Sequence, residues 1–323
     1  MKMGIIGAGA IASCMARTIG PMQEVEAYAI ASRNLEKARS FADEYGFEKA
    51  YGSYEEMVAD PEVELVYIAT PHSHHYEHMK LCIEHGKPVL CEKAFTQNAA
   101  QAREILALAE EKKVFVTEAI WTRYMPMRWK LDEILASGVI GEPLSISATL
   151  SYVISQNERI YRPELAGGIL LDCGVYPINF ASMVFGDDFS DVKATALLND
   201  LGVDMSTNIA LTWPDGKTAY LHADARVADD RQGIVRGSKG YVVCKNINNC
   251  EGLEVYDTNH QLVASYETPA QITGYEYEVL SCMKALQEGA LECPEMPHSE
   301  TIRIMELMDR IREQIGVVYP NER

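Results

Sequence analysis

This chain has few basic residues relative to its acidic ones, no closely spaced cysteine pairs and few long apolar runs. Asp and Glu number 47 against 29 Lys and Arg, a formal charge of −18, which argues against a surface for nucleic acid or anionic membranes. No apolar run is expected to reach the roughly 18 residues of a membrane span, and the first strand begins too early for a signal peptide. None of the eight cysteines forms a C-x-x-C pair, which suits reduced thiols in a cytoplasm. We therefore expect a cytoplasmic protein with no nucleic-acid or membrane partner.

A length of 323 residues exceeds the size at which single cores stop growing, so we expect two domains, residues 1–122 and 123–323. In the first, buried strand patterns alternate with helical patterns, which predicts an α/β domain of the Rossmann type with a doubly wound parallel sheet. The predicted strands are 3–6, 25–31, 65–69, 88–91 and 114–117, and the predicted helices are 10–19, 35–45, 54–59, 75–85 and 99–111.

After residue 126 the pattern changes to half-buried strands, which predicts an α+β domain with a large, mostly antiparallel sheet that is open on one face. The predicted strands are 144–152, 192–198, 206–213, 218–225, 233–236, 240–244 and 253–256, with helices at 127–136, 275–288 and 299–314. An uncovered apolar sheet face usually marks an interface, so we expect a homodimer through this sheet.

Residues 4–12 join a buried strand to a glycine turn and a helix start, in the pattern G-x-G-x-x-A. Gly7 permits a sharp turn, Gly9 has no Cβ to hold a pyrophosphate away, and Ala12 allows close packing of the helix on the strand. The helix begins at Ala10 and Ile11, whose amides would face the anion. The pattern predicts dinucleotide binding; the alternative is a tight turn with a purely structural role.

The end of the second predicted strand has no Asp or Glu, the residues that bind the ribose 2′-hydroxyl of NAD. Ser32 and Arg33 stand there instead, and Lys37 follows one turn along the next helix. A hydroxyl and cations suit a 2′-phosphate, so the sequence favours NADP over NAD. In the alternative interpretation Ser32 caps the helix and Arg33 is a surface charge.

Ligands of open α/β sheets bind beyond the carboxyl ends of the strands, so the residues that follow each strand are candidates for the site. Thr70, Pro71 and His72 follow one strand, and Lys93 follows the next. Lys93 could hold a substrate hydroxyl beside a bound nicotinamide, or it could be a surface lysine.

Four histidines lie close together in this part of the sequence, at positions 72, 74, 75 and 78. His74 and His78 have the i, i+4 spacing of a zinc-binding helix. No cysteine or carboxylate set completes such a site, so we expect no metal.

Four segments carry a resemblance to a known family: residues 4–12, residues 69–71 with His75, residues 86–93, and residues 167–176. Together they resemble the glucose-fructose oxidoreductase, inositol dehydrogenase and rhizopine catabolism (Gfo/Idh/MocA) family, and the similarity extends over both halves of the chain. Residues 118–124 and 182–186 look like the branch of the dimeric trans-1,2-dihydrodiol dehydrogenases and NADP-dependent D-xylose 1-dehydrogenases.

The resemblance implies roles for matching residues. Lys93 corresponds to the lysine of the family's Glu-Lys-Pro motif, although Ala94 replaces the proline. Tyr176 would be the acid/base residue, Asp172 an orienting or substrate-binding carboxylate, and Trp121 a wall of the substrate pocket. The cofactor would contact Gly7, Gly9, Ala10, Ile11, Ser32, Arg33, Lys37, Thr70, Pro71, His72, His75, Glu92 and Lys93.

A phenol titrates at about pH 10 in water and serves as a base at neutral pH only beside a positive charge. The Lys93 ammonium could supply that charge to Tyr176. Without the resemblance, Tyr176 could equally be a core aromatic residue on the helix that leads to Phe185. His75 is expected to make hydrogen bonds at a helix start rather than to act as a base.

The expected reaction is hydride transfer between NADP and the CH–OH group of a sugar hemiacetal or vicinal diol. Two alternatives keep the same fold: a glycosidase that uses nicotinamide for transient oxidation, and a catalytically silent NADP sensor. The substrate itself depends on loops such as 155–165 and 229–232, whose conformations do not follow from the sequence.

Overall fold

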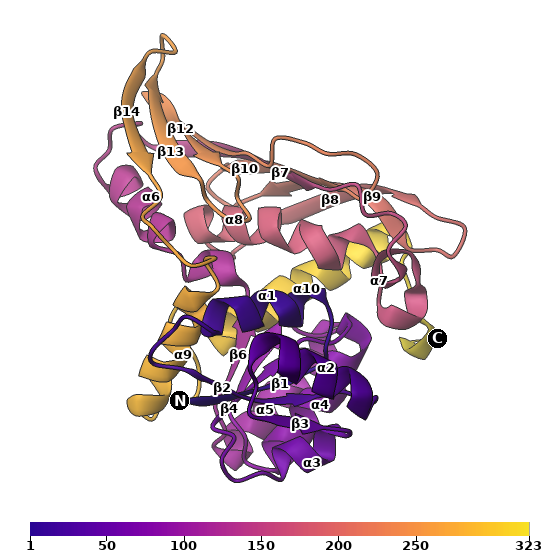
Figure 1. Ribbon diagram of the computed structural model, residues 1–323. Coiled ribbons are helices and arrows are strands. Elements are labelled where there is room, and N and C mark those ends of the chain that lie inside the picture. The colour runs from indigo at the N-terminus through magenta and orange to yellow at the C-terminus, as the bar shows by residue number, and fades with distance from the viewer. Residues whose placement is uncertain (323) are drawn as a thin grey trace. The chain divides into compact units, whose positions relative to one another are not determined.

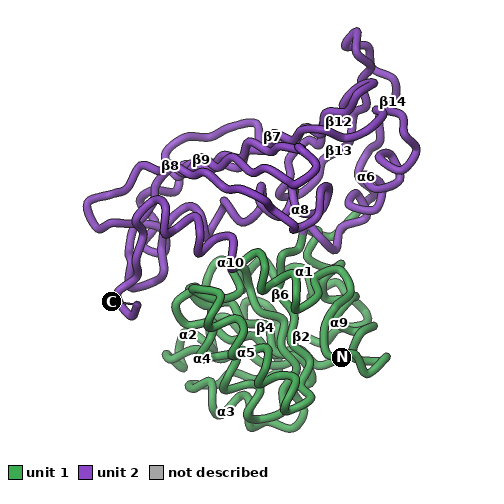
Figure 2. Tube along the Cα trace, turned by 180° about the vertical axis from the view of Figure 1, so that it is seen from behind, with its two compact units in different colours: residues 1–121, 271–305 green, residues 122–270, 306–323 purple. Residues whose placement is uncertain are grey.

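The computed structural model describes residues 1–322, which divide into two compact units (Figure 2). Unit 1 comprises Met1–Trp121 and Gln271–Met305, and unit 2 comprises Thr122–Ala270 and the segment from Glu306 onward. Residues 271–305 thus pack with the first part of the chain, although the predicted boundary placed them in the second domain. One tie is the Val116 amide, which donates to the Leu291 carbonyl at 3.0 Å.

Unit 1 contains a six-stranded sheet in the order β3-β2-β1-β4-β5-β6, with every pair parallel. The strands are β1 (Lys2–Ile6), β2 (Glu26–Ala31), β3 (Lys49–Tyr51), β4 (Leu65–Ile68), β5 (Val89–Glu92) and β6 (Val116–Ala119). All residues of β4 and β5 and the last four residues of β1 are buried, as expected for a sheet covered on both faces. The predicted doubly wound parallel sheet is confirmed.

The helices of unit 1 are α1 (Ala10–Ile19), α2 (Leu35–Tyr45), α3 (Tyr54–Val58), α4 (His72–Glu84), α5 (Ala99–Lys112), α9 (Glu276–Gln287) and the first half of α10 (His298–Ile315), up to Met305. The predicted limits of α1 and α2 agree with the structure. α4 begins three residues before its predicted start, because Pro71 supplies the extended residue that precedes its first turn. The parallel strands of unit 1 all end at one edge of the sheet, and α1 to α5 follow the ends of β1 to β5.

Unit 2 contains an eight-stranded sheet in the order β14-β13-β12-β11-β7-β10-β9-β8. The strands are β7 (Pro143–Ser151), β8 (Asp191–Leu198), β9 (Asp204–Thr212), β10 (Thr218–Asp224), β11 (Gly233–Gly237), β12 (Gly240–Lys245), β13 (Gly252–Asp257) and β14 (Leu262–Glu267). The β7–β10 pair is parallel and the others are antiparallel, so the predicted mostly antiparallel sheet is confirmed.

Helices cover one face of this sheet, where α8 packs along β7 and β10 and α6 lies beside β13 (Figure 1). The helical segments of unit 2 are η1 (Trp121–Arg123, shared with unit 1), α6 (Pro126–Ala136), α7 (Glu158–Tyr161), η2 (Pro163–Leu165), η3 (Leu170–Gly174), α8 (Val175–Phe185), the second half of α10 (His298–Ile315) and η4 (Pro320–Glu322). On the other face, side chains such as Tyr220, which is 63% exposed, border an open groove. η3 continues directly into α8 and packs against the same face of the sheet, on β7, β9 and β10.

Residues 163–185, from η2 to the end of α8, have the length and apolar composition of a membrane span. The expectation that no apolar run reaches that length is wrong for this stretch. Within residues 1–322 it is the one stretch that passes this test, and 83% of its apolar window is buried inside the structure. Burial of that kind is typical of a core helix, which passes the same test.

Candidate functional site

The glycine turn between β1 and α1 has the geometry of an anion cradle. Gly7 has a φ of +99°, and a Cβ there would lie 2.8 Å from the Ala69 carbonyl oxygen, so no larger residue fits. A Cβ on Gly9 would meet nothing within 4 Å, which leaves its outer side open. Gly9 is also the N-cap of α1 and provides no side-chain hydrogen bond to the first amides.

Three other helices of unit 1 have a side-chain cap at their starts, whereas α1, α4 and α9 have none. The side chains of Asn34, Ser53 and Asn98 accept hydrogen bonds from the first-turn amides of α2, α3 and α5. The start of α1 therefore presents backbone N–H groups and a positive dipole end to an open space. These features fit the pyrophosphate of a dinucleotide.

Ser32, Arg33 and Lys37 lie where β2 ends and α2 begins. Asn34 is the N-cap of α2, accepting the Lys37 amide at 3.1 Å, so the alternative in which Ser32 caps this helix is wrong. The Ser32 oxygen accepts the Asn34 amide at 3.3 Å, and its hydroxyl hydrogen can be donated elsewhere. Arg33 and Lys37 are exposed, as a site for a phosphate requires.

Three flat side chains lie close to the Arg33 charge. The rings of His74 and His78 stack with centroids 5.8 Å apart, and Tyr54 meets His78 edge-on at 4.6 Å. Burial, and then the charge of Arg33, lower the pKa of His74. Burial and the neighbouring histidines, with a smaller effect of Arg33, lower the pKa of His78 to about 4. Both rings are therefore neutral at pH 7.

The contacts of His74 and His78 bear on the alternative in which these two residues bind zinc. His78 Nδ1 lies 3.0 Å from the Thr70 hydroxyl, and His74 Nδ1 lies 2.9 Å from the Ser73 hydroxyl. Within residues 1–322 no group of three or more His, Cys, Asp or Glu side chains is arranged to hold a metal ion. All eight cysteines are reduced thiols, and seven are buried.

His75 lies in the first turn of α4, completely buried, between the segments that follow β4 and β5. Its Nε2 is 2.8 Å from the Thr70 carbonyl and its Nδ1 is 2.9 Å from the Ala94 carbonyl. Burial lowers its pKa to about 4, against the opposing effect of these carbonyls. The His75 ring therefore connects the segments that follow β4 and β5. Because both of its nitrogens already contact backbone carbonyls, it is a poor candidate for a catalytic base.

Lys93 follows β5 directly, and its backbone amide donates to the Glu92 carboxylate at 3.1 Å. The Tyr67 hydroxyl donates a short hydrogen bond to the other oxygen of Glu92, so this carboxylate is held from two sides. The Lys93–Ala94 peptide bond is cis, at the position where the family motif carries proline. Glu92 and Tyr67 thus fix the backbone from which the Lys93 side chain departs.

Glu278 of α9 is a further carboxyl group in this region, and sequence reasoning missed it. It is fully buried, and neither carboxyl oxygen has a hydrogen-bond partner among the described residues. Burial first, and then the charges of Glu92 and Cys293, raise its pKa well above the ordinary value. The surroundings of Glu278 therefore favour its protonated, neutral form.

In unit 2, Asp172 lies in η3 and Tyr176 in the first turn of α8, and both are buried. Asp172 forms a short ion pair with Arg159 of α7, and the Cys173 thiol lies 3.6 Å from its other oxygen. Arg159 is therefore the charged partner of the predicted substrate-binding carboxylate. Its spacing from Asp172 shows no periodicity that would have revealed the pair.

Two glycines and an aspartate explain why η3 begins where it does. Gly168 has a φ of +111°, and a Cβ there would lie 2.1 Å from an Asp204 oxygen. That carboxylate accepts the Leu170 amide at 2.8 Å and the Thr207 hydroxyl at 2.6 Å. A Cβ on Gly167 would collide with the Ile160 carbonyl at 2.6 Å. The Gly-Gly pair thus lets Asp204 cap the segment that carries Asp172.

The predicted site residues fall into two groups. The glycine turn, Arg33, His75, Lys93 and Trp121 share unit 1, where the parallel strands end. Asp172 and Tyr176 share unit 2, one helical turn apart. That Lys93 and Tyr176 act on one substrate stays a prediction.

Comparison with protein families matches both parts of the chain. Residues 1–120 match the model described as the oxidoreductase family with an NAD-binding Rossmann fold (GFO/IDH/MocA). Residues 129–243 match the GFO/IDH/MocA C-terminal domain.

Curated relatives extend over the whole chain. The trans-1,2-dihydrobenzene-1,2-diol dehydrogenase of Mus musculus is 33% identical, covering 100% of this chain and 99% of the relative. The enzyme of the same name from Homo sapiens is 32% identical with the same coverage.

Solved structures share the fold. KijD10, a 3-ketoreductase from Actinomadura kijaniata in complex with NADP and TDP-benzene, has a TM-score of 0.89 and 26% identity over 99% of each chain. Levoglucosan dehydrogenase in complex with NADH and L-sorbose has a TM-score of 0.86 and 20% identity, covering 98% of this chain and 96% of the other, and supports the fold alone.

Proposed function

This chain belongs to the GFO/IDH/MocA family of NAD(P)-dependent oxidoreductases, and from that premise we propose that it transfers a hydride between NADP and the CH–OH group of a sugar hemiacetal or vicinal diol. The relatives named as dihydrodiol dehydrogenases support the diol, and KijD10, a 3-ketoreductase crystallised with NADP and TDP-benzene, supports hydride transfer at a carbon that alternates between ketone and alcohol. Dehydrogenation of a cyclic hemiacetal would give a lactone, and that of a diol a hydroxyketone.

The observation that carries the proposal is the open glycine start of α1 on the same sheet edge as Lys93. Gly9 leaves the first amides of α1 without a side-chain cap, and β5 ends at Glu92, immediately before Lys93. A dinucleotide bound at that edge would lie beside the residues that follow the strands. A catalytically silent NADP sensor would need the glycine turn that binds the cofactor. It would not need Lys93, whose backbone amide is bound by the buried Glu92 carboxylate.

NADP rather than NAD is favoured by the residues at the end of β2. No acidic side chain stands there to bind a 2′-hydroxyl and repel a phosphate, and Arg33 offers a planar cation with several donors. Ser32 can donate its hydroxyl hydrogen, and Lys37 adds a second charge one turn later. The NADP bound in the KijD10 structure agrees with this choice.

When bound, the cofactor supplies the hydride acceptor, and the chain has to bind the substrate and move one proton. We assign the proton at the substrate hydroxyl to the Tyr176 phenol, the stabilising positive charge to the Lys93 ammonium, and substrate orientation to Asp172. The ion pair with Arg159 holds the Asp172 carboxylate in place, and a carboxylate oxygen is a strong acceptor for a substrate hydroxyl. Trp121 would form an apolar wall of the pocket.

We further propose a homodimer that works in the cytoplasm without nucleic acid or membrane. The charge of −18 and the reduced thiols support the location, and the uncovered face of the eight-stranded sheet supports the assembly. A groove on that face is lined by side chains of β7, β8, β9 and β10, among them Tyr220 and Lys193.

The test is a substrate screen with purified protein. Aldoses and trans-diols are assayed with oxidised NADP and NAD in parallel, and dicarbonyls with NADPH and NADH, in each case by the absorbance of the reduced cofactor. We expect turnover with NADP on at least one sugar or diol. Cofactor binding without turnover on any compound would favour the NADP sensor, and release of nitrophenol from glycosides without net cofactor reduction would favour the glycosidase.

A further inference from the structure

Two aromatic side chains far apart in the sequence lie face to face in unit 1. The rings of Trp121 and Tyr275 have centroids 3.9 Å apart and planes 6° from parallel. Trp121 stands just after β6, at the edge where the parallel strands end, and is 5% exposed. Tyr275 immediately precedes α9 and is half-buried. The tyrosine thus covers one face of the indole.

The turn that carries Tyr275 is built rigidly. The Glu276 carboxylate accepts the amides of Ile272 at 2.6 Å, Thr273 at 3.1 Å and Gly274 at 2.7 Å. Three charge-assisted hydrogen bonds from consecutive amides hold the turn around one buried carboxylate. The position of Tyr275 is therefore set by its own helix start and not by a loose loop.

A side-chain contact connects this turn to α1, the helix that begins at the glycine turn. The Thr273 and Thr18 hydroxyls lie 2.6 Å apart, and Thr18 is a fully buried residue of α1. The Thr273 oxygen also lies within reach of the Tyr275 amide, at 3.3 Å. The helix that begins at the glycine turn thus supports the aromatic stack.

We propose that Tyr275 is a positioning residue for substrate selection, which holds the Trp121 indole in one orientation by stacking on it. This inference rests on the proposed function, in which Trp121 forms a wall of the substrate pocket. With one face covered by Tyr275, the indole can offer a substrate only its remaining face and its edges. The orientation of that surface then determines which rings pack against it.

The effect should differ between two classes of substrate. A cyclohexadiene diol is flat and apolar on its ring faces, so its binding depends on the orientation of an aromatic wall. A pyranose is puckered and is recognised mainly through hydrogen bonds to its hydroxyl groups. Loosening the indole should therefore weaken binding of the flat diol more than that of the sugar.

The experiment compares Tyr275→Leu, Tyr275→Phe and the control Tyr277→Leu with the unmodified protein. Tyr277 is a neighbouring tyrosine of α9 that takes part in no aromatic stack within residues 1–322. Steady-state kinetics are measured with trans-1,2-dihydrobenzene-1,2-diol and D-xylose, with near-ultraviolet circular dichroism as a reporter of the stack and melting temperature as a reporter of folding.

We expect Tyr275→Leu to raise KM for the diol about tenfold, to change KM for the sugar less than threefold and to leave kcat within threefold. Its aromatic dichroism should fall, whereas Tyr275→Phe and the control should retain it together with the original KM values. Equal changes with both substrates, no change, or a lower melting temperature with an unaltered KM ratio would overturn the role of Tyr275 while leaving the proposed function intact. An unmodified protein that oxidises neither compound class would overturn the proposed function, and this inference with it.

Discussion

The imidazole of His75 joins the start of α4 to Ala94, whose carbonyl oxygen lies 2.9 Å from Nδ1. Its other nitrogen lies 2.8 Å from the Thr70 carbonyl, so one ring connects the residues that follow β4 and β5. A neutral imidazole carries a single N–H and can donate to only one carbonyl at a time. Burial nevertheless keeps the ring neutral, because its pKa is lowered to about 4.

His75 should make folding stability depend on pH. Its pKa is about 4 in the folded protein and about 6.5 in the unfolded chain, so the unfolded state binds more protons between these values. The stabilisation is complete above about pH 6.5 and is lost as the pH falls toward 4. Between pH 7 and pH 5 this amounts to about 2 kcal/mol.

The measurement is urea unfolding of the unmodified protein and of His75→Gln at pH 7 and pH 5. The variant should lose less stability on acidification, by about 2 kcal/mol. The exposed His85, replaced in the same way, is the control and should leave the pH dependence unchanged. Equal losses in the unmodified protein and His75→Gln would show that the His75 ring does not stay neutral in the fold.

The two glycines of the first turn should respond differently to alanine. Gly7→Ala places a Cβ 2.8 Å from the Ala69 carbonyl at a φ of +99°, and should destabilise the fold by about 1–3 kcal/mol. Gly9→Ala meets no atom within 4 Å, so its melting temperature should be nearly unchanged. The added methyl group would instead occupy the cradle and weaken NADP binding at least tenfold.

Calorimetric titration and thermal melting separate these effects. Tight NADP binding by Gly9→Ala would show that the pyrophosphate lies elsewhere.

Arg33→Ala should reduce the preference for NADP over NAD. The guanidinium contacts only the 2′-phosphate in this proposal, so the Kd of adenosine 2′,5′-bisphosphate should rise about 10- to 100-fold while that of 5′-AMP stays within threefold. Arg39→Ala removes another exposed cation of α2 and serves as the control. A parallel loss with both nucleotides would mean that Arg33 binds the adenosine rather than the phosphate.

Tyr176→Phe should lower kcat by about 10² to 10⁴ through loss of the acid/base group. Cofactor affinity, measured by fluorescence titration with NADPH, should stay within threefold because the ring is retained. Tyr266→Phe, on the edge strand β14, is the control and should keep full turnover. Turnover at the original rate in Tyr176→Phe would assign the proton transfer to another group.

Local patterns were sufficient for most of the architecture. The limits of α1 and α2 follow from glycine and asparagine at their starts and from clear helical periodicity. Strand β3 was missed because its three half-buried residues are too few to show alternation. Strand β14 was missed because it is an edge strand with mostly exposed side chains and no buried face.

Tertiary relationships within the site could not be predicted in the same way. Motifs identified Gly9, Arg33 and Lys93, because short-range spacing carries their chemistry. The stack of Trp121 on Tyr275 and the pairing of Arg159 with Asp172 join residues with no shared periodicity. The burial of Glu278 could not be predicted, because a glutamate on an amphipathic helix is normally expected on its exposed face.

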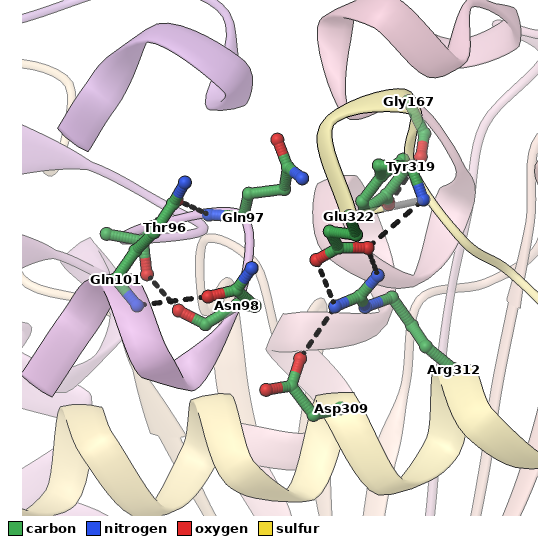
Figure 3. A network of polar contacts seen from close by, with 9 residues as sticks. All are labelled: Thr96, Gln97, Asn98, Gln101, Gly167, Asp309, Arg312, Tyr319 and Glu322. Atoms are coloured by element: carbon green, nitrogen blue, oxygen red, sulfur yellow. Dashed lines mark hydrogen bonds and ion pairs between the residues drawn. The ribbon is translucent and has the colours of Figure 1, made fainter. Parts of the chain in front are cut away.

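The last residues of the described chain are tied into unit 2 by charge. The Arg312 guanidinium binds both oxygens of Glu322 at 2.9 and 3.0 Å and one oxygen of Asp309 at 2.8 Å (Figure 3). Arg312 is 6% exposed, and the Tyr319 hydroxyl beside it donates to the Gly167 carbonyl at 2.8 Å. Figure 3 also shows a separate cap in unit 1, where Asn98 accepts the Gln101 amide at the start of α5.

Shortening the protein by even a few amino acids at its carboxyl end would therefore reach the interior. Removal of Glu322 would take away the carboxylate that binds the buried Arg312 guanidinium through both oxygens and leave Asp309 to pair with it, which should lower the stability of the fold. Because Tyr319 contacts Gly167, the damage would spread to the glycine pair that precedes the Asp172 segment.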